Sequence, residues 1–149
     1  MSAAYELAKS ALLCGVDAFI IQDIGVAQMV RECFPQARLH ASTQMSVMNP
    51  AGLRKLKEMG AKNVLVSMGK TGAALIDEAG QEYFLKSPEG KRVNTVGSGD
   101  SMVAGFIAGF LKYNNYNEAL KMGVSAGSAS ALSKYLATKE EVYNLFNNI

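Results

Sequence analysis

Helical patterns and short apolar runs alternate along the chain as far as residue 68. Apolar residues recur at helical spacing in three segments, which we expect to be helices: 4–12, 26–34 and 50–59. Between and after them lie three short apolar runs that predict buried strands: 16–21, 38–42 and 64–68. Because helices and strands alternate through short connections, the pattern predicts parallel strands joined by right-handed crossovers.

The period changes after residue 68. Gly69 and Gly72 bracket a turn, and two short strands at 73–77 and 82–86 flank Ala79-Gly80, which predicts a hairpin. Three further helices are expected at 101–113, 117–135 and 139–146, the last with the capping box Thr138-x-x-Glu141. We therefore predict an α/β fold with a mainly parallel central sheet flanked by helices and a small β-hairpin. Doubly wound topology is favoured over a closed barrel, which needs more strands.

Composition narrows the class of protein. The 149 residues carry 15 basic and 13 acidic side chains, a net charge of +2 with no basic run, which argues against a nucleic-acid partner. No apolar run approaches the roughly 20 residues that span a membrane, and no signal-peptide pattern is present. We expect a cytoplasmic protein without a membrane partner. The low charged fraction of 19% is consistent with a partner surface, such as that of a homo-oligomer.

Cysteine and histidine indicate no metal or redox chemistry. Cys14 and Cys33 lie in periodic apolar stretches without CxxC spacing, so we expect both to be buried free thiols. The single histidine, His40, has no His or Cys companion at the spacing of a metal site. No metal-ligating residue is assigned.

The segment VNTVGSGDSMVAGF, residues 93–106, is the most informative part of the chain. A Gly-Ser-Gly turn leads into Asp100 and then into a helical pattern. Small residues let the backbone approach a ligand closely, and the N-terminus of a helix suits a phosphate. Asp100 has two interpretations: it caps the helix, or it takes a proton from a hydroxyl that attacks that phosphate.

A second unusual segment is the helical pattern rich in small residues at 123–131. Two glycines in a helix cost about 1 kcal/mol each relative to alanine. Either close helix packing or a flat ligand, such as a purine ring against the helix, explains them. By itself the pattern favours packing.

From about Lys62 to the C-terminus, the chain resembles the C-terminal part of PfkB-type sugar kinases, which have the ribokinase-like fold. Three motifs carry the resemblance in the family's order and spacing: VLVSMGKTGAALI at 64–76, NTVGSGDSMVAGF at 94–106 and SAGSASAL at 125–132. Asn94 with Ser101-Met102 resembles the branch of 1-phosphofructokinase and tagatose-6-phosphate kinase.

This resemblance implies ATP-dependent phosphoryl transfer to a sugar phosphate. An enzyme with this activity is a phosphotransferase with an alcohol acceptor. It implies ATP and Mg²⁺ as cofactors, with a nucleotide and a sugar phosphate as small-molecule partners. The backbone N–H groups of Gly97, Ser98 and Gly99 would form an anion hole, and Asp100 would be the catalytic base. The residues expected at the nucleotide are Ser67, Gly69, Gly72, Asn94, Thr95, Gly127 and Ser128.

Residues 1–49 resemble a different family, the collagenase-like peptidases. The resemblance lies in GVDAFIIQDIGVAQMVRE at 15–32 and LHASTQMSVMN at 39–49. The cysteine-containing signature of that family is absent, so peptidase activity is not implied. Five polar residues at the expected strand ends are either site residues or plain loop residues: Asp23, His40, Ser42, Thr43 and Gln44.

We therefore expect two segments, 1–50 and 51–149, packed as one domain, with the seam between Pro50 and Lys62. A natural fusion, an engineered recombinant and a misassembled reading frame all explain such a chain. The leading interpretation is an incomplete kinase that keeps the nucleotide and anion-hole half, because the region that supplies the sugar pocket in the family is replaced. The alternatives are a fragment of a collagenase-like peptidase and a non-catalytic interaction or scaffold module.

Overall fold

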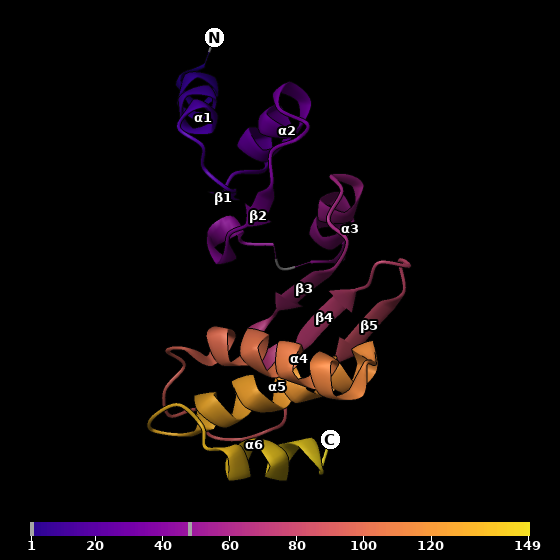
Figure 1. Cartoon of the computed structure of the whole chain (residues 1–149). Coiled ribbons are helices and arrows are strands. Elements are labelled where there is room, and N and C mark those ends of the chain that lie inside the picture. Colours follow the sequence, from indigo (N-terminus) through magenta and orange to yellow (C-terminus); the bar gives the residue numbers. More distant parts are fainter. Residues whose placement is uncertain (1, 48) are drawn as a thin grey trace. The chain divides into compact units, whose positions relative to one another are not determined.

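The computed structural model describes residues 2–47 and 49–149, which belong to two compact units, Met1–Val47 and Met48–Ile149 (Figure 1). Met1 and Met48, which belong to the expected segment 1–50, lie outside the described residues. The packing of the two segments as one domain stays a prediction.

The first unit is a small α/β arrangement around a pair of strands. Its elements are α1 (Ala3–Leu13), β1 (Phe19–Ile21), α2 (Ile24–Cys33), β2 (Leu39–Ala41) and the 3₁₀ helix η1 (Thr43–Met45). Strands β1 and β2 pair in parallel with Phe19 opposite Leu39, which confirms the predicted direction. Buried Val30 from α2 contributes to the core, and the rings of Tyr5 and Phe34 stack at 5.3 Å.

The described part of the second unit combines four α-helices with an antiparallel sheet. Its elements are α3 (Pro50–Glu58), β3 (Val64–Ser67), the 3₁₀ helix η2 (Gly69–Thr71), β4 (Ala73–Ile76), β5 (Glu82–Leu85), α4 (Ser98–Tyr113), α5 (Tyr116–Leu132) and α6 (Lys139–Phe146). The sheet order is β3-β4-β5, and both pairs are antiparallel. The expected hairpin at 73–86 is confirmed. The expectation of a mainly parallel sheet is wrong, because parallel pairing in the described residues is confined to β1 and β2.

The turn after β3 explains this difference. The chain reverses between Ser67 and Ala73 through η2, and the N–H of Met68 donates to the carbonyl of Gly72 at 2.8 Å. Gly72 has φ of +121°, and a Cβ there would collide with the carbonyl oxygen of Leu85. So short a connection can only join antiparallel neighbours, because a parallel pair needs a crossover of a dozen residues or more.

Helices α4 and α5 cover one face of this sheet (Figure 1). Leu75 of β4 is fully buried and packs in one cluster with Met102 of α4 and with Leu120 and Val124 of α5. Burying an aliphatic side chain stabilises the fold by roughly 1.5–3 kcal/mol relative to exposing it. This cluster is therefore the core of the second unit.

Glycines bring α4 and α5 unusually close together. A Cβ on Gly105 would lie 2.7 Å from the Cβ of Ala126 and 2.8 Å from the carbonyl oxygen of Met122. On the facing helix, a Cβ on Gly123 would lie 2.9 Å from the carbonyl oxygen of Met102. Real Cβ atoms do not approach so closely, so the small residues are required by packing, as the sequence pattern favours.

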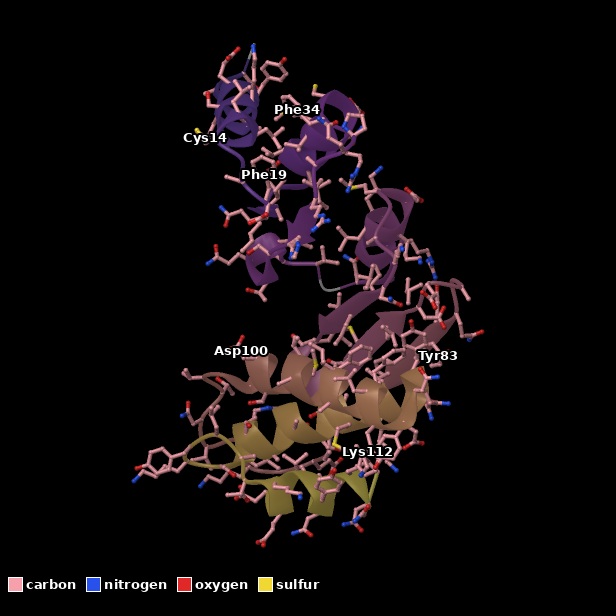
Figure 2. All side chains as sticks on the ribbon, viewed as in Figure 1. Cys14, Phe19, Phe34, Tyr83, Asp100 and Lys112 are labelled. Carbon is pink, nitrogen blue, oxygen red and sulfur yellow. The ribbon has the colours of Figure 1, made fainter. Side chains whose placement is uncertain are left out.

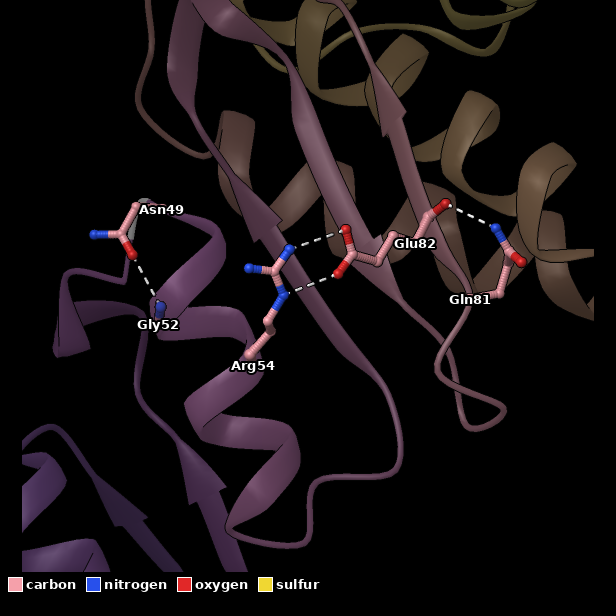
Figure 3. A network of polar contacts seen from close by, with 5 residues as sticks. All are labelled: Asn49, Gly52, Arg54, Gln81 and Glu82. Atoms are coloured by element: carbon pink, nitrogen blue, oxygen red, sulfur yellow. Dashed lines mark hydrogen bonds and ion pairs between the residues drawn. The ribbon is translucent and has the colours of Figure 1, made fainter.

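Polar contacts connect helix α3 to the residues that flank the turn of the β4–β5 hairpin. Figure 3 shows the guanidinium of Arg54 against the carboxylate of Glu82, with Nε and Oε1 3.1 Å apart. Both side chains are more than half exposed, so this pair contributes only about 0–1 kcal/mol. Lys57 is better enclosed: its Nζ donates to the backbone carbonyls of Lys62 and Asp77, each at 2.8 Å.

Asp77 organises the turn of the hairpin. Its side chain is buried, with Oδ1 accepting from the N–H of Gln81 at 2.9 Å and Oδ2 accepting from the hydroxyl of Tyr83 at 3.0 Å. Burial by itself would raise the pKa of Asp77, but these hydrogen bonds and those from the backbone of the turn outweigh burial and lower the pKa.

The helix ends differ slightly from expectation, and one expectation about the thiols is wrong. Helix α4 begins at Ser98, three residues before the predicted start, and α5 ends at Leu132. Helix α6 has the predicted bounds and the complete Thr138–Glu141 capping box. Cys14, the C-cap of α1, and Cys33, the last residue of α2, are free but exposed, not buried. Among the described residues, no helix has the length and apolarity needed to cross a membrane.

The glycine contacts predict opposite effects for two substitutions in α4. Gly105→Ala should lower the free energy of unfolding by up to about 2 kcal/mol, because overpacking of roughly 1–3 kcal/mol exceeds the gain in helix propensity. Gly99→Ala is the matched control, because a Cβ there meets nothing within 4 Å. It should raise stability by up to about 1 kcal/mol. Urea denaturation followed by circular dichroism measures both, and equal effects would contradict the close packing.

The lowered pKa of Asp77 predicts a contribution to stability that depends on pH. The contribution is complete above the ordinary value of 3.8 and is lost as the pH falls through the lower pKa of the folded state. Urea denaturation at pH values between about 2 and 6 should show this loss in the wild-type chain and not in Asp77→Asn. Glu78→Gln is the control, because Glu78 is an exposed carboxylate in the same turn. An unchanged pH profile in Asp77→Asn would exclude the proposed role.

Candidate functional site

A cleft in the second unit lies where the end of β3, the beginning of α4 and the second half of α5 meet. Its volume is about 150 Å³, smaller than the roughly 300–1,000 Å³ of complete small-molecule pockets, so it would enclose only part of a ligand. The lining residues are Ser67, Gly69, Gly72, Ser87, Arg92, Thr95, Ser98, Gly99, Met102, Val124, Gly127, Ser128 and Ala131.

The cleft brings together most of the residues that the sequence motifs single out. From all three motifs, the following predicted residues line it: Ser67, Gly69, Gly72, Thr95, Ser98, Gly99, Gly127 and Ser128. Gly97, Asp100 and Asn94 do not. Segments more than fifty positions apart in the sequence therefore meet at the cleft.

The first turn of α4 offers free backbone donors. Gly97 is the N-cap, with φ of +76°, a left-handed conformation that suits glycine. The N–H of Ser98 donates to the carbonyl of Thr95 at 3.3 Å, and the Ser98 hydroxyl donates to the same oxygen at 2.8 Å. The N–H groups of Gly97, Gly99 and Asp100 donate to no other described residue. This differs from the predicted anion hole, because Ser98 is engaged and the N–H of Asp100 is available.

Asp100 is the third residue of α4 and not its cap. The cap is Gly97, which has no side chain to accept a hydrogen bond, so the capping interpretation of Asp100 is wrong. The carboxylate of Asp100 is exposed at the beginning of the helix (Figure 2), and it makes no hydrogen bond or ion pair with the rest of the described chain. A negative charge is favourable there because of the helix dipole.

Asn94 holds the loop before α4 in place. Its Oδ1 accepts from the N–H of Val96 at 3.1 Å, and its Nδ2 donates to the carbonyl of Lys134 at 3.2 Å. Its backbone N–H donates to the carbonyl of Ala131 at 3.3 Å. These contacts connect the loop to the end of α5 and leave the amide little capacity for a ligand.

Helix α5 forms one wall of the cleft and packs against α4 at the same place. A Cβ on Gly127 would lie 3.0 Å from both the Cβ of Met102 and the carbonyl oxygen of Ser98. Gly127 therefore lets the first turn of α4 approach α5 and keeps the cleft open at the same point. The hydroxyl oxygen of Ser128 lies 3.0 Å from that of Ser87 and joins α5 to the chain after β5.

Two polar lining residues, Arg92 and Ser87, were not predicted from the sequence. Arg92 is the only charged residue among those that line the cleft. The sequence contains a signal for Arg92, because the basic pair Lys91-Arg92 lies just before the segment 93–106, whose Gly-Ser-Gly turn was expected to bind an anion. Ser87 had no such signal, since only its contact with Ser128, 41 positions away, brings it to the cleft.

The candidate residues of the first unit have structural explanations. Asp23 caps α2, with Oδ1 accepting from the N–H of Val26 at 2.8 Å, and Ser42 caps η1 by accepting from the N–H of Gln44 at 3.2 Å. His40 is exposed on β2, and Thr43 lies in η1. In the described part of the chain, no group of three His, Cys, Asp or Glu side chains is placed to hold a metal ion.

Comparison with solved structures defines the class of protein. Phosphofructokinase-2 from Escherichia coli, in complex with potassium, aligns with a TM-score of 0.59 and 28% identity over 69% of this chain and 35% of its own. Ribokinase from Arabidopsis thaliana, complexed with ribose and ATP, aligns with a TM-score of 0.58 and 25% identity over 64% of this chain and 32% of its own. The fold is therefore that of the ribokinase-like sugar kinases.

The family follows from the sequence match. Residues 47–142 match the pfkB family of carbohydrate kinases, and the chain belongs to this family. The 1-phosphofructokinase of Bacillus subtilis is 47% identical over 96 residues, which are 64% of this chain and 31% of that enzyme. The chain thus spans about a third of the length of the curated relatives it matches.

The first part of the chain matches a second family. Residues 1–69 match Peptidase family U32, which confirms the resemblance of this part to a peptidase family. The two matches overlap at residues 47–69, and this overlap contains the predicted seam between Pro50 and Lys62.

Proposed function

We propose that the second unit binds ATP in the cleft and that the chain is the nucleotide and anion-hole half of a kinase that acts on a sugar phosphate. One observation carries the proposal: free N–H donors at the beginning of α4 lie beside a cleft whose only charged lining residue is Arg92. Donors and positive charge in this arrangement favour a polyphosphate.

The lining of the cleft offers contacts to both the phosphates and the base of ATP. The free N–H groups of Gly97, Gly99 and Asp100 would receive phosphate oxygens, and the positive end of the α4 dipole would add to their attraction. The apolar lining residues Met102, Val124 and Ala131 would contact the base.

Asp100 would be the catalytic base. Its exposed carboxylate shares the first turn of α4 with the free N–H groups, so a hydroxyl near the bound γ-phosphate would also be near Asp100. Asp100 would take the proton as the phosphoryl group moves to the hydroxyl oxygen and ADP leaves. A single carboxylate does not form a metal cage, so Mg²⁺ would be held chiefly by the nucleotide phosphates and would neutralise their charge.

The sugar side of the reaction is not supplied by this chain. The resemblance implies that the region before the three motifs supplies the sugar pocket, whereas here the residues before 47 match Peptidase family U32. We therefore propose nucleotide binding with little turnover. We also propose that the chain joins two unrelated segments within residues 47–69, which a single continuous reading frame in the DNA would support.

Calorimetric titration with ATP and Mg²⁺ tests the nucleotide site. The wild-type chain should bind, and Arg92→Gln should weaken binding by about three- to tenfold, because one charge-assisted contact is lost. Lys91→Gln is the matched control, since Lys91 is the neighbouring cation but does not line the cleft. Absence of binding at millimolar nucleotide would exclude the site, and equal effects of the two substitutions would exclude the role of Arg92.

Asp100→Asn tests the role of the carboxylate. With fructose 1-phosphate as acceptor, any turnover of the wild-type chain should fall by about a hundredfold or more in the variant, because the base is removed. Affinity for ATP should change by less than about threefold, since the N–H donors of the backbone remain. A coupled assay for ADP and the same calorimetry measure the two quantities. Turnover that survives in Asp100→Asn would assign the base elsewhere.

A further inference from the structure

A groove in the second unit lies between α4 and α6, next to the middle of α5. Its volume is about 390 Å³, within the roughly 300–1,000 Å³ range of small-molecule pockets. It shares no lining residue with the cleft described above. The groove is therefore a separate feature that the proposed nucleotide site does not use.

The floor of this groove is lined mainly by small and apolar residues: Ala104, Gly105 and Ala108 of α4, Met122 and Ala126 of α5, and Val142 of α6. Close packing requires the glycine at Gly105. The lining hydroxyls of Ser101 and Ser130 are hydrogen-bonded to each other at 2.9 Å. Such a floor offers a flat apolar body a surface to cover and gives it few free hydrogen-bond partners.

Two ammonium groups and a phenol line the groove. Lys112 (Figure 2) donates from Nζ to the hydroxyl of Tyr143 at 3.2 Å, and its Nζ lies 5.1 Å from the centre of that ring. Lys139, one helical turn before Tyr143, places its Nζ 6.0 Å from the same centre. Two cations therefore flank one aromatic ring.

No opposite charge balances these cations within the described residues. No Asp or Glu is among the lining residues of the groove, and neither Lys112 nor Lys139 forms an ion pair there. The hydroxyls of Tyr113 and Tyr143 raise the pKa of Lys112, so its ammonium group stays protonated at neutral pH. An anion that entered the groove would thus meet two unpaired positive charges.

We propose that this groove binds a small organic anion with a flat apolar body, whose anionic group contacts Lys112, Lys139 and Tyr143 while the body covers the floor at Gly105 and Ala108. The apolar floor disfavours sugar phosphates, which carry hydroxyls over their whole surface and would lose hydrogen bonds with water there. The anionic group alone would be weakly held by exposed lysines, so both parts are needed for affinity.

Titration of the full chain with naphthalene-2-sulfonate tests this site. Calorimetry at low salt should give a Kd of about 1 mM or tighter, and the neutral analogue 2-naphthalenemethanol should bind at least about fivefold more weakly. The double variant Lys112→Gln/Lys139→Gln should weaken binding of the sulfonate by about tenfold. Lys134→Gln is the matched control, because Lys134 also lies over a tyrosine ring but does not line the groove.

Amide chemical shifts locate the site without any substitution. In the wild-type chain, the sulfonate should shift the amide signals of Ala104, Ala108 and Val142 and leave those of Ser98 and Gly127 in the nucleotide cleft unchanged. Absence of binding at about 5 mM, equal affinity of the neutral analogue, or shifts confined to the cleft would each overturn the proposal. Circular dichroism shows whether the lysine variants are folded. If they are not folded, the amide shifts of the wild-type chain test the proposal without them.

Discussion

The close contact between α4 and α5 is the constraint on which the rest of the second unit depends. Gly105 and Gly109 face α5, and Gly123 and Gly127 face α4, at positions where a Cβ would meet backbone or side-chain atoms at 2.7–3.0 Å. Because the helices lie so near each other, the first turn of α4 reaches Gly127 in the wall of the cleft, and Gly105 lines the groove beside α6. Packing therefore contributes to both the cleft and the groove.

The first turn of α4 concentrates opposite electrostatic features in a few residues. Its free N–H groups and helix dipole attract an anion, whereas the carboxylate of Asp100 repels one. The carboxylate is exposed and forms no hydrogen bond or ion pair with the rest of the described chain. The negative charge of Asp100 is favourable at the positive end of the helix, and the proposed function gives the same carboxylate the role of a base beside a bound phosphate.

The region shared by the two family matches is connected to the sheet of the second unit. Helix α3 and strand β3 form a helix–strand unit, and Lys57 joins them to the end of β4 through two carbonyl contacts at 2.8 Å. The sheet, α4 and α5 bury their own core around Leu75 and Leu120. Helix α3 and strand β3 lie in the overlap of the two family matches, residues 47–69, and β3 pairs with β4 beyond it. The kinase part of the chain does not rely on the first unit for its core.

Local chemistry was enough to predict the helices, the hairpin at Ala79-Gly80, the Thr138–Glu141 box and the motif residues around Gly97, because periodicity, turn residues and caps act over a few positions. Contacts between distant segments decided the rest. The turn at Gly72 makes β3 antiparallel to β4, and the start of α4 at Ser98 removes Asp100 from the cap. The exposure of Cys14 and the presence of Ser87 and Arg92 at the cleft depend on which surfaces meet. A linear pattern does not contain that information, since strand direction and burial are properties of neighbours that lie far apart in the chain.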